Sequence, residues 1–116
     1  MPLRIEHWQQ EWGPLSEAAM RRRLEAEGYS ASRYVYSPGT EFPEHTHSVD
    51  KKDTVLRGRL KIGAEGREVV LEPGDMIEIP AGTVHTAEVV GAEAVTSLDA
   101  TRPPAQGRGA RADSPR

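Results

Sequence analysis

The sequence contains no cysteine, few aromatic residues (5%) and no long apolar segment. Without cysteine the chain has no disulfide framework, no thiolate metal ligand and no cysteine nucleophile. No apolar run approaches the roughly 18 residues that a membrane-spanning helix needs, and the N-terminus lacks the pattern of a signal peptide. We therefore expect a cytoplasmic protein with no membrane partner, whose chemistry depends on other side chains.

The charge is modest and unevenly distributed. Lysine and arginine number 15 against 18 acidic residues, so the formal net charge is -3. This balance gives no electrostatic reason to expect a nucleic-acid partner. From Pro103 the composition turns to Pro, Gly, Arg, Ala and Ser without periodicity. We expect residues 103–116 to form a disordered basic tail.

A chain of 116 residues suits one domain. Residues 1–30 are expected to form an N-terminal arm and a helix over 15–27, because Ser16 can cap the start of that helix and Gly28 can end it. Residues 31–102 hold the remaining segments and are expected to form the folded barrel described below. Since so small a domain has a modest core, a homodimer is the expected assembly.

Short strand-like segments follow the helix. Pro-Gly, Ala-Glu-Gly and Pro-Gly-Asp sequences separate brief apolar or alternating runs, which is typical of small β domains. The spacing predicts six or seven strands and an all-β fold of sandwich or barrel type. The expected strands cover residues 32–37, 54–62 (interrupted at Gly58), 67–72, 76–79, 85–90 and 94–99.

Three of the four histidines indicate a metal site. His45 and His47 are two residues apart, so on an extended strand their side chains project from one face. His85 follows His47 by 38 residues and lies on a different predicted strand. It can join the pair only where the sheet folds back on itself, as in a closed barrel. Imidazole is the commonest side-chain ligand for transition metals, which makes all three candidate ligands.

The segments that carry these histidines resemble the two sequence motifs of the cupin superfamily. The first motif, G-x5-H-x-H-x(3,4)-E-x6-G, is matched in spacing by Gly39, His45, His47 and Gly58. The second, G-x5-P-x-G-x2-H-x3-N, is matched by Gly74, Pro80, Gly82 and His85. The resemblance covers roughly residues 32–99. It implies a small single-domain cupin, which is a jelly-roll β-barrel, here with one N-terminal α-helix.

Two positions depart from these motifs. The first-motif glutamate, which the resemblance implies as a fourth metal ligand, falls at Lys51, and the second-motif asparagine falls at Val89. This leaves three alternatives: a three-histidine site completed by solvent, a substitute ligand from Asp50 or Asp53, or a pocket without metal. Lys51 itself can bind an anionic substrate, act as a base with a lowered pKa, or lie on the surface.

The resemblance implies a metal-binding cupin in which His45, His47 and His85 hold Fe, Mn, Ni or Zn. A small-molecule ligand would bind at the open positions, and oxygenase or isomerase chemistry is the expected class. Glu78 alternates with apolar neighbours, so it either faces solvent or orients one of the ligand histidines by a hydrogen bond to its ring. The alternative functions are a non-catalytic small-ligand-binding or sensory module, and a structural role of the barrel alone.

Overall fold

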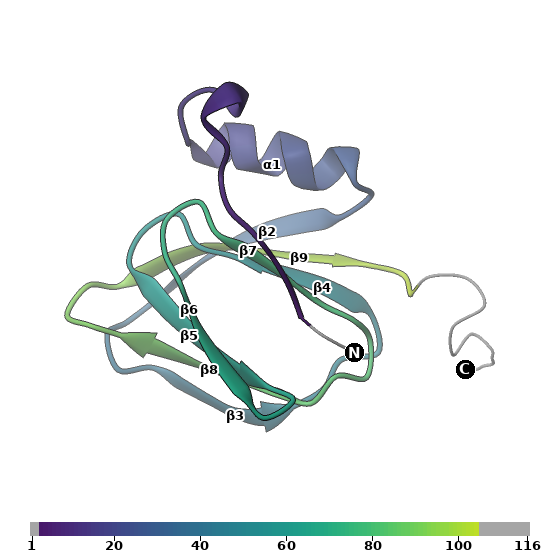
Figure 1. The fold of residues 1–116 in the computed structure, drawn as a ribbon, viewed down its shortest axis with the longest axis vertical. Helices are drawn as coiled ribbons and strands as arrows, with labels where there is room; N and C mark the ends of the chain where they lie inside the picture. Colours follow the sequence, from purple (N-terminus) through teal and green to yellow (C-terminus); the bar gives the residue numbers. More distant parts are fainter. Residues whose placement is uncertain (1–2, 105–116) are drawn as a thin grey trace.

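The computed structural model describes residues 3–104. This part of the chain folds into nine strands, one α-helix and a short 3-10 helix (Figure 1), and none of its helices is long and apolar enough to cross a membrane. Most of the expected basic tail, residues 105–116, lies outside the described residues. In chain order the elements are β1 (Arg4–Glu6), η1 (Gln10–Trp12), α1 (Glu17–Ala26), β2 (Ser30–Tyr36), β3 (Glu41–His45), β4 (Asp50–Thr54), β5 (Arg59–Ala64), β6 (Arg67–Leu71), β7 (Met76–Ile79), β8 (His85–Val90) and β9 (Val95–Arg102).

The strands form two antiparallel sheets that pack against each other. One sheet has the order β1-β7-β4-β9-β2 and the other has the order β3-β8-β5-β6. Apolar side chains from both sheets fill the space between them, among them Ile62 and Leu71 from one sheet and Ile77 and Val95 from the other. This arrangement confirms the predicted all-β jelly-roll fold with one N-terminal α-helix. The described residues hold nine strands where six or seven were predicted, and one of the added strands, β1, precedes the helix and pairs with β7.

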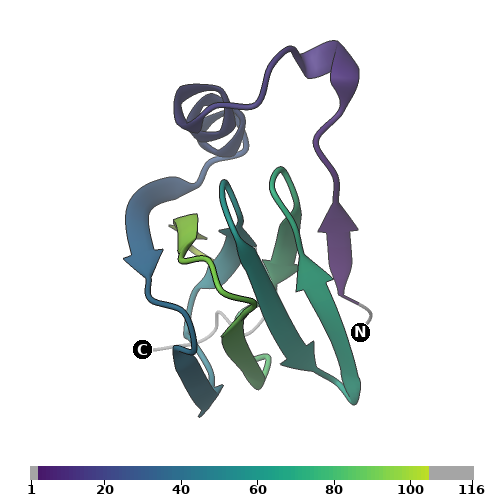
Figure 2. The same cartoon turned by 90° about the vertical axis from the view of Figure 1, so that its left-hand side faces the viewer.

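Helix α1 packs on the outer face of the five-stranded sheet (Figures 1 and 2). The predicted cap is confirmed, since the Ser16 hydroxyl accepts a hydrogen bond from the Ala19 N–H at 3.0 Å. The predicted terminator is also confirmed, because Gly28 has a φ of 89° and the Tyr29 N–H donates to the Leu24 carbonyl at 3.0 Å. The helix and sheet share a second core of Met20, Leu24, Tyr29, Met76, Leu98 and Ala100.

The strand expected at residues 54–62 is wrong in its boundaries. The structure has two strands here, β4 ending at Thr54 and β5 beginning at Arg59. Four of the five residues of β4 are charged, so no apolar alternation identifies it as a strand. It forms because β7 and β9 pair with it on both sides and satisfy its backbone hydrogen-bonding groups.

Gly58 lies in the turn between β4 and β5. Its φ of 79° is in the left-handed region that favours glycine. A Cβ at this position would lie 2.5 Å from the carbonyl oxygen of Ala94, on the segment that leads into β9. This turn therefore needs glycine both for its backbone angle and for its close approach to a neighbouring chain segment.

We expect Gly58→Ala to lower the free energy of unfolding by about 2–4 kcal/mol, because backbone strain and the clash with the Ala94 carbonyl add. Urea denaturation monitored by circular dichroism measures the loss. Gly66→Ala is the matched control: its φ is 75°, but nothing lies within 4 Å of the added Cβ. That variant should lose only about 1 kcal/mol, and equal losses in the two variants would contradict the steric part of the argument.

Candidate metal centre

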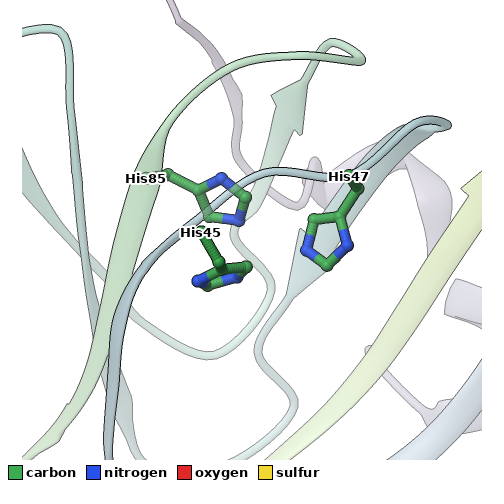
Figure 3. Close-up of side chains that lie close together, drawn as sticks. All are labelled: His45, His47 and His85. Carbon is green, nitrogen blue, oxygen red and sulfur yellow. The ribbon is translucent and has the colours of Figure 1, made fainter.

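Three histidine side chains lie together where β3 meets β8 (Figure 3). His45, the last residue of β3, is the register partner of His85, the first residue of β8, and His47 follows just beyond β3. The ring centroids are 4.2 Å apart for His45 and His85, 4.9 Å for His45 and His47, and 5.3 Å for His47 and His85. One ring nitrogen from each histidine lies within 4.8 Å of the other two. The structure thus brings the three predicted ligands to one point that a single metal ion can occupy.

Two of the rings are oriented by backbone carbonyls. The Nδ1 of His45 lies 2.7 Å from the Pro43 carbonyl oxygen, and the Nδ1 of His85 lies 2.9 Å from that of Thr83. A carbonyl oxygen only accepts hydrogen bonds, so Nδ1 must carry the proton in both rings. Each Nε2 then keeps its lone pair for a metal, which is the usual arrangement behind a metal-binding histidine.

The surroundings favour the neutral form of two histidines. Burial lowers the pKa of His47, and the positive charge of Lys51 lowers it further. Burial also lowers the pKa of His85, although the hydrogen bond to the Thr83 carbonyl partly opposes this effect. Because a metal binds neutral imidazole, these two rings are ready to bind at about pH 7 with little competition from protons.

The histidines line a cavity of about 410 Å³ whose walls come from both sheets. Cavities of this size hold small molecules. Phe42, Leu60 and Ala87 supply apolar walls. The polar lining, besides the histidines, includes Tyr36, Lys51, Asp53, Ser97 and Asp99.

Lys51 belongs to this cavity because side chains alternate along β4. Lys51 and Asp53 line the cavity, whereas Lys52 lies on the helix side, held by two glutamates. Lys51 is buried, and its ammonium donates to the Asp99 carboxylate and lies 3.4 Å from a carboxylate oxygen of Asp53. Burial by itself lowers the pKa of Lys51, but the two carboxylates outweigh burial and raise it. The charged ammonium is therefore the favoured form.

The two aspartates expected as substitute ligands have other partners. A carboxylate oxygen of Asp50 accepts a hydrogen bond from the Ala81 N–H at 2.9 Å, and so supports the turn before His85. Asp53 pairs with Lys51, and burial raises the pKa of its carboxyl while Lys51 opposes that rise. Between residues 3 and 104, the group of side chains close enough to share a metal consists of the three histidines and includes neither aspartate.

Glu78 lies on the opposite face of β7 from Ile77 and Ile79, which pack in the core between the sheets. Its carboxylate is 3.8 Å from the guanidinium of Arg4 in β1. This position agrees with the solvent-facing alternative and directs the carboxylate away from the histidines.

Sequence reasoning did not single out Asp99 and Ser97, which share one face of β9. Leu98, between them, packs on the opposite face under the helix. Alternation within the predicted strand at residues 94–99 was the available signal, because it places Ser97 and Asp99 together. What local sequence cannot supply is the pairing of β4 with β9, in which Asp53 is the register partner of Asp99.

A jelly-roll barrel with three histidines facing its cavity defines the cupin class of protein. Residues 32–101 match the family described as "Cupin domain", and the chain belongs to that family. Among curated proteins, the chain is similar to "Acireductone dioxygenase 1" of Pectobacterium atrosepticum, with 28% identity over 72% of this chain and 62% of that protein. It is also similar to "Acireductone dioxygenase" of Synechococcus sp., with 37% identity over 47% of this chain and 32% of that protein. The chain thus spans less than two thirds of the length of either relative.

Several solved structures share the fold. A protein of unknown function from Rhizobium leguminosarum is 28% identical, with a TM-score of 0.59 over 65% of this chain and 70% of that one. A protein from Thermus thermophilus is 27% identical, with a TM-score of 0.59 over 66% of this chain and 74% of that one. A cupin superfamily protein from Desulfitobacterium hafniense, 21% identical, has a TM-score of 0.59 over 65% of this chain and 67% of that one.

Replacing Lys51 by methionine should lower the free energy of unfolding by about 3–5 kcal/mol, because it leaves two carboxylates without their cation in a buried site. Chemical denaturation at neutral pH measures the change. Lys61→Met is the matched control, since Lys61 also pairs with a carboxylate, that of Glu88 at 3.2 Å, but on the surface. The free energy of unfolding of this control should differ little from that of the unaltered protein. A Lys51 variant as stable as this control would show that the buried cluster does not need its lysine.

Proposed function

We propose that this protein is a metal-dependent cupin enzyme that acts on a small molecule, with dioxygenase chemistry as its reaction class. The observation that carries the proposal is the group of three histidines, with ligand nitrogens within 4.8 Å of one another, at the wall of a small-molecule cavity. Three imidazole ligands suit Fe, Mn, Ni or Zn. A bound ion of this kind polarises a ligand oxygen and, if it is redox-active, allows dioxygen chemistry.

The donor set fits such a metal. Imidazole nitrogens alone leave the full positive charge of the ion for a ligand to neutralise, and an ion that prefers more than four ligands keeps positions for substrate and solvent. The carbonyls of Pro43 and Thr83 hold two rings in the orientation and tautomer that ligation requires. The apolar walls formed by Phe42, Leu60 and Ala87 exclude water from one side of the ligand.

The similarity to two proteins named as acireductone dioxygenases supports the choice of a dioxygenase. The shared part corresponds to 62% of the longer-matched relative and 28% of its positions are identical. For this chain we therefore propose the reaction class and take acireductone as the first substrate to test. The alternative is a module that binds a small ligand at the same metal without turning it over.

Purified, untagged protein should bind one equivalent of a divalent transition metal, and His85→Ala should lose most of this binding, because one of three ligands is gone. Elemental mass spectrometry after dialysis against Fe(II), Mn(II), Ni(II) and Zn(II) in turn measures the stoichiometry. His7→Ala is the matched control, since His7 pairs with Asp75 away from the cavity. Metal bound equally by the two variants, or by neither variant nor the unaltered protein, would refute the proposed centre.

Metal-loaded protein should consume dioxygen when acireductone is added, and the His85→Ala variant treated in the same way should not. An oxygen electrode measures the uptake under conditions in which the metal content of each sample is known. Protein that is fully loaded with Fe(II) or Ni(II), but consumes no dioxygen above the rate without protein, would rule out this substrate. If acireductone still binds to that loaded protein, the result would favour the binding module.

A further inference from the structure

A second polar group lines the same cavity as the histidines. It consists of Lys51 and Asp53 on β4 and Asp99 on β9, and we call it the acidic subsite. Asp53 and Asp99 are register partners on neighbouring strands, and Lys51 shares the inward face of β4 with Asp53. The positions of all three residues are therefore set by strand pairing and not by a loop.

The charges of the acidic subsite do not leave a free cation. Lys51 donates to Asp99 and lies 3.4 Å from Asp53, so two carboxylates face one ammonium. An anionic group of a ligand would have to displace resident carboxylates that are already held in place. The pairing therefore argues against Lys51 as an anion receptor, because like charges close together in a buried site repel strongly.

Exposure shows which of these groups a ligand meets. The side chain of Asp99 is 24% exposed, whereas that of Lys51 is 8% exposed and that of Asp53 is 14% exposed. Asp99 thus has the most accessible side chain of the cluster, and Lys51 has the least accessible. A carboxylate in this position accepts hydrogen bonds and attracts positive charge.

Neutral hydroxyl groups flank the acidic subsite. Ser97 and Tyr36 line the cavity with it, and the Tyr36 ring packs edge-on against Phe42 with centroids 5.0 Å apart. Burial raises the pKa of the Tyr36 phenol, and the nearby carboxylates of Asp99 and Asp53 raise it further. Tyr36 therefore keeps its proton, and this wall adds hydroxyl groups without adding charge.

We propose that the acidic subsite binds a hydroxyl or ammonium group of a small ligand whose oxygen atoms bind the metal at the other side of the cavity. The inference rests on the proposed function, because it assumes a metal at the three histidines. It goes further by defining the substrate class: a compact molecule with a metal-binding oxygen pair and a hydrogen-bond-donating end. Ligands that end in a carboxylate or a phosphate are disfavoured.

Four hydroxamates that differ only at the end away from the metal-binding group test this inference. Glycine hydroxamate ends in an ammonium, glycolohydroxamate in a hydroxyl, acetohydroxamate in a methyl group and succinic monohydroxamate in a carboxylate. Isothermal titration calorimetry on Co(II)-loaded protein gives the dissociation constants. We expect the ammonium-bearing and hydroxyl-bearing compounds to bind about tenfold more tightly than acetohydroxamate, and the carboxylate-bearing compound to bind the most weakly.

Asp99→Asn should remove most of the preference for the ammonium, so that the dissociation constants of glycine hydroxamate and acetohydroxamate become nearly equal. Glu93→Gln is the control, because it removes the same charge from an exposed position after β8, and it should keep the preference. Each variant is first compared with the unaltered protein by circular dichroism and by its cobalt content. If Asp99→Asn does not fold, the four dissociation constants of the unaltered protein still show whether the cavity prefers a hydrogen-bond-donating end or a carboxylate.

Two results would overturn the inference. The carboxylate-bearing compound could bind as tightly as glycine hydroxamate or more tightly, which would make Lys51 the group that the ligand meets. All four compounds could instead bind equally, which would mean that the acidic subsite does not contact the ligand. In both cases the metal centre stands. Protein that takes up no Co(II) would overturn both the inference and the proposed function.

Discussion

The buried charges of β4 are the constraint on which the rest of the structure depends. A charged strand in the middle of a sheet is tolerated only if its side chains find partners, because an unpaired buried charge is strongly destabilising. Because side chains alternate along β4, its buried charges find partners on both faces of the sheet. Lys52 pairs with one glutamate from β1 and one from the end of the helix, and Lys51 pairs with Asp53 and Asp99 in the cavity. One strand thus joins the N-terminal arm, the helix and the candidate ligand site.

The same strand also helps to position the histidines. Asp50, its first residue, accepts a hydrogen bond from the backbone of Ala81, in the turn that leads to His85. In that turn the Gly82 N–H donates to the His47 carbonyl at 2.9 Å. The loop that carries His47 and the strand that carries His85 are therefore held to each other by main-chain contacts.

Local sequence signals predicted the features that depend on residues close together in the chain, such as the helix ends and the turns. The helix begins at its Ser16 cap and ends at Gly28 as predicted, and most strands lie between the turns that glycine and proline mark. The resemblance of the histidine segments to the cupin motifs also predicted the fold. The expected strands did not include β1 or β3, and the prediction also failed at β4, where four charged residues in a row resemble a solvated loop. That segment is a strand because of its neighbours, and no property of its own sequence reveals them.

In the candidate site, too, some features could be predicted from the sequence and others depended on the tertiary structure. The amino-acid order alone specified the three histidines and the unusual lysine at position 51, because spacing within a motif is a property of the sequence. Only the tertiary structure decided what that lysine does. Asp99 lies 48 residues further along the chain, and it reaches Lys51 through the pairing of β4 with β9. Such long-range registers depend on which faces of the strands are buried together. Burial of these faces depends on the packing of the whole barrel and not on any one segment.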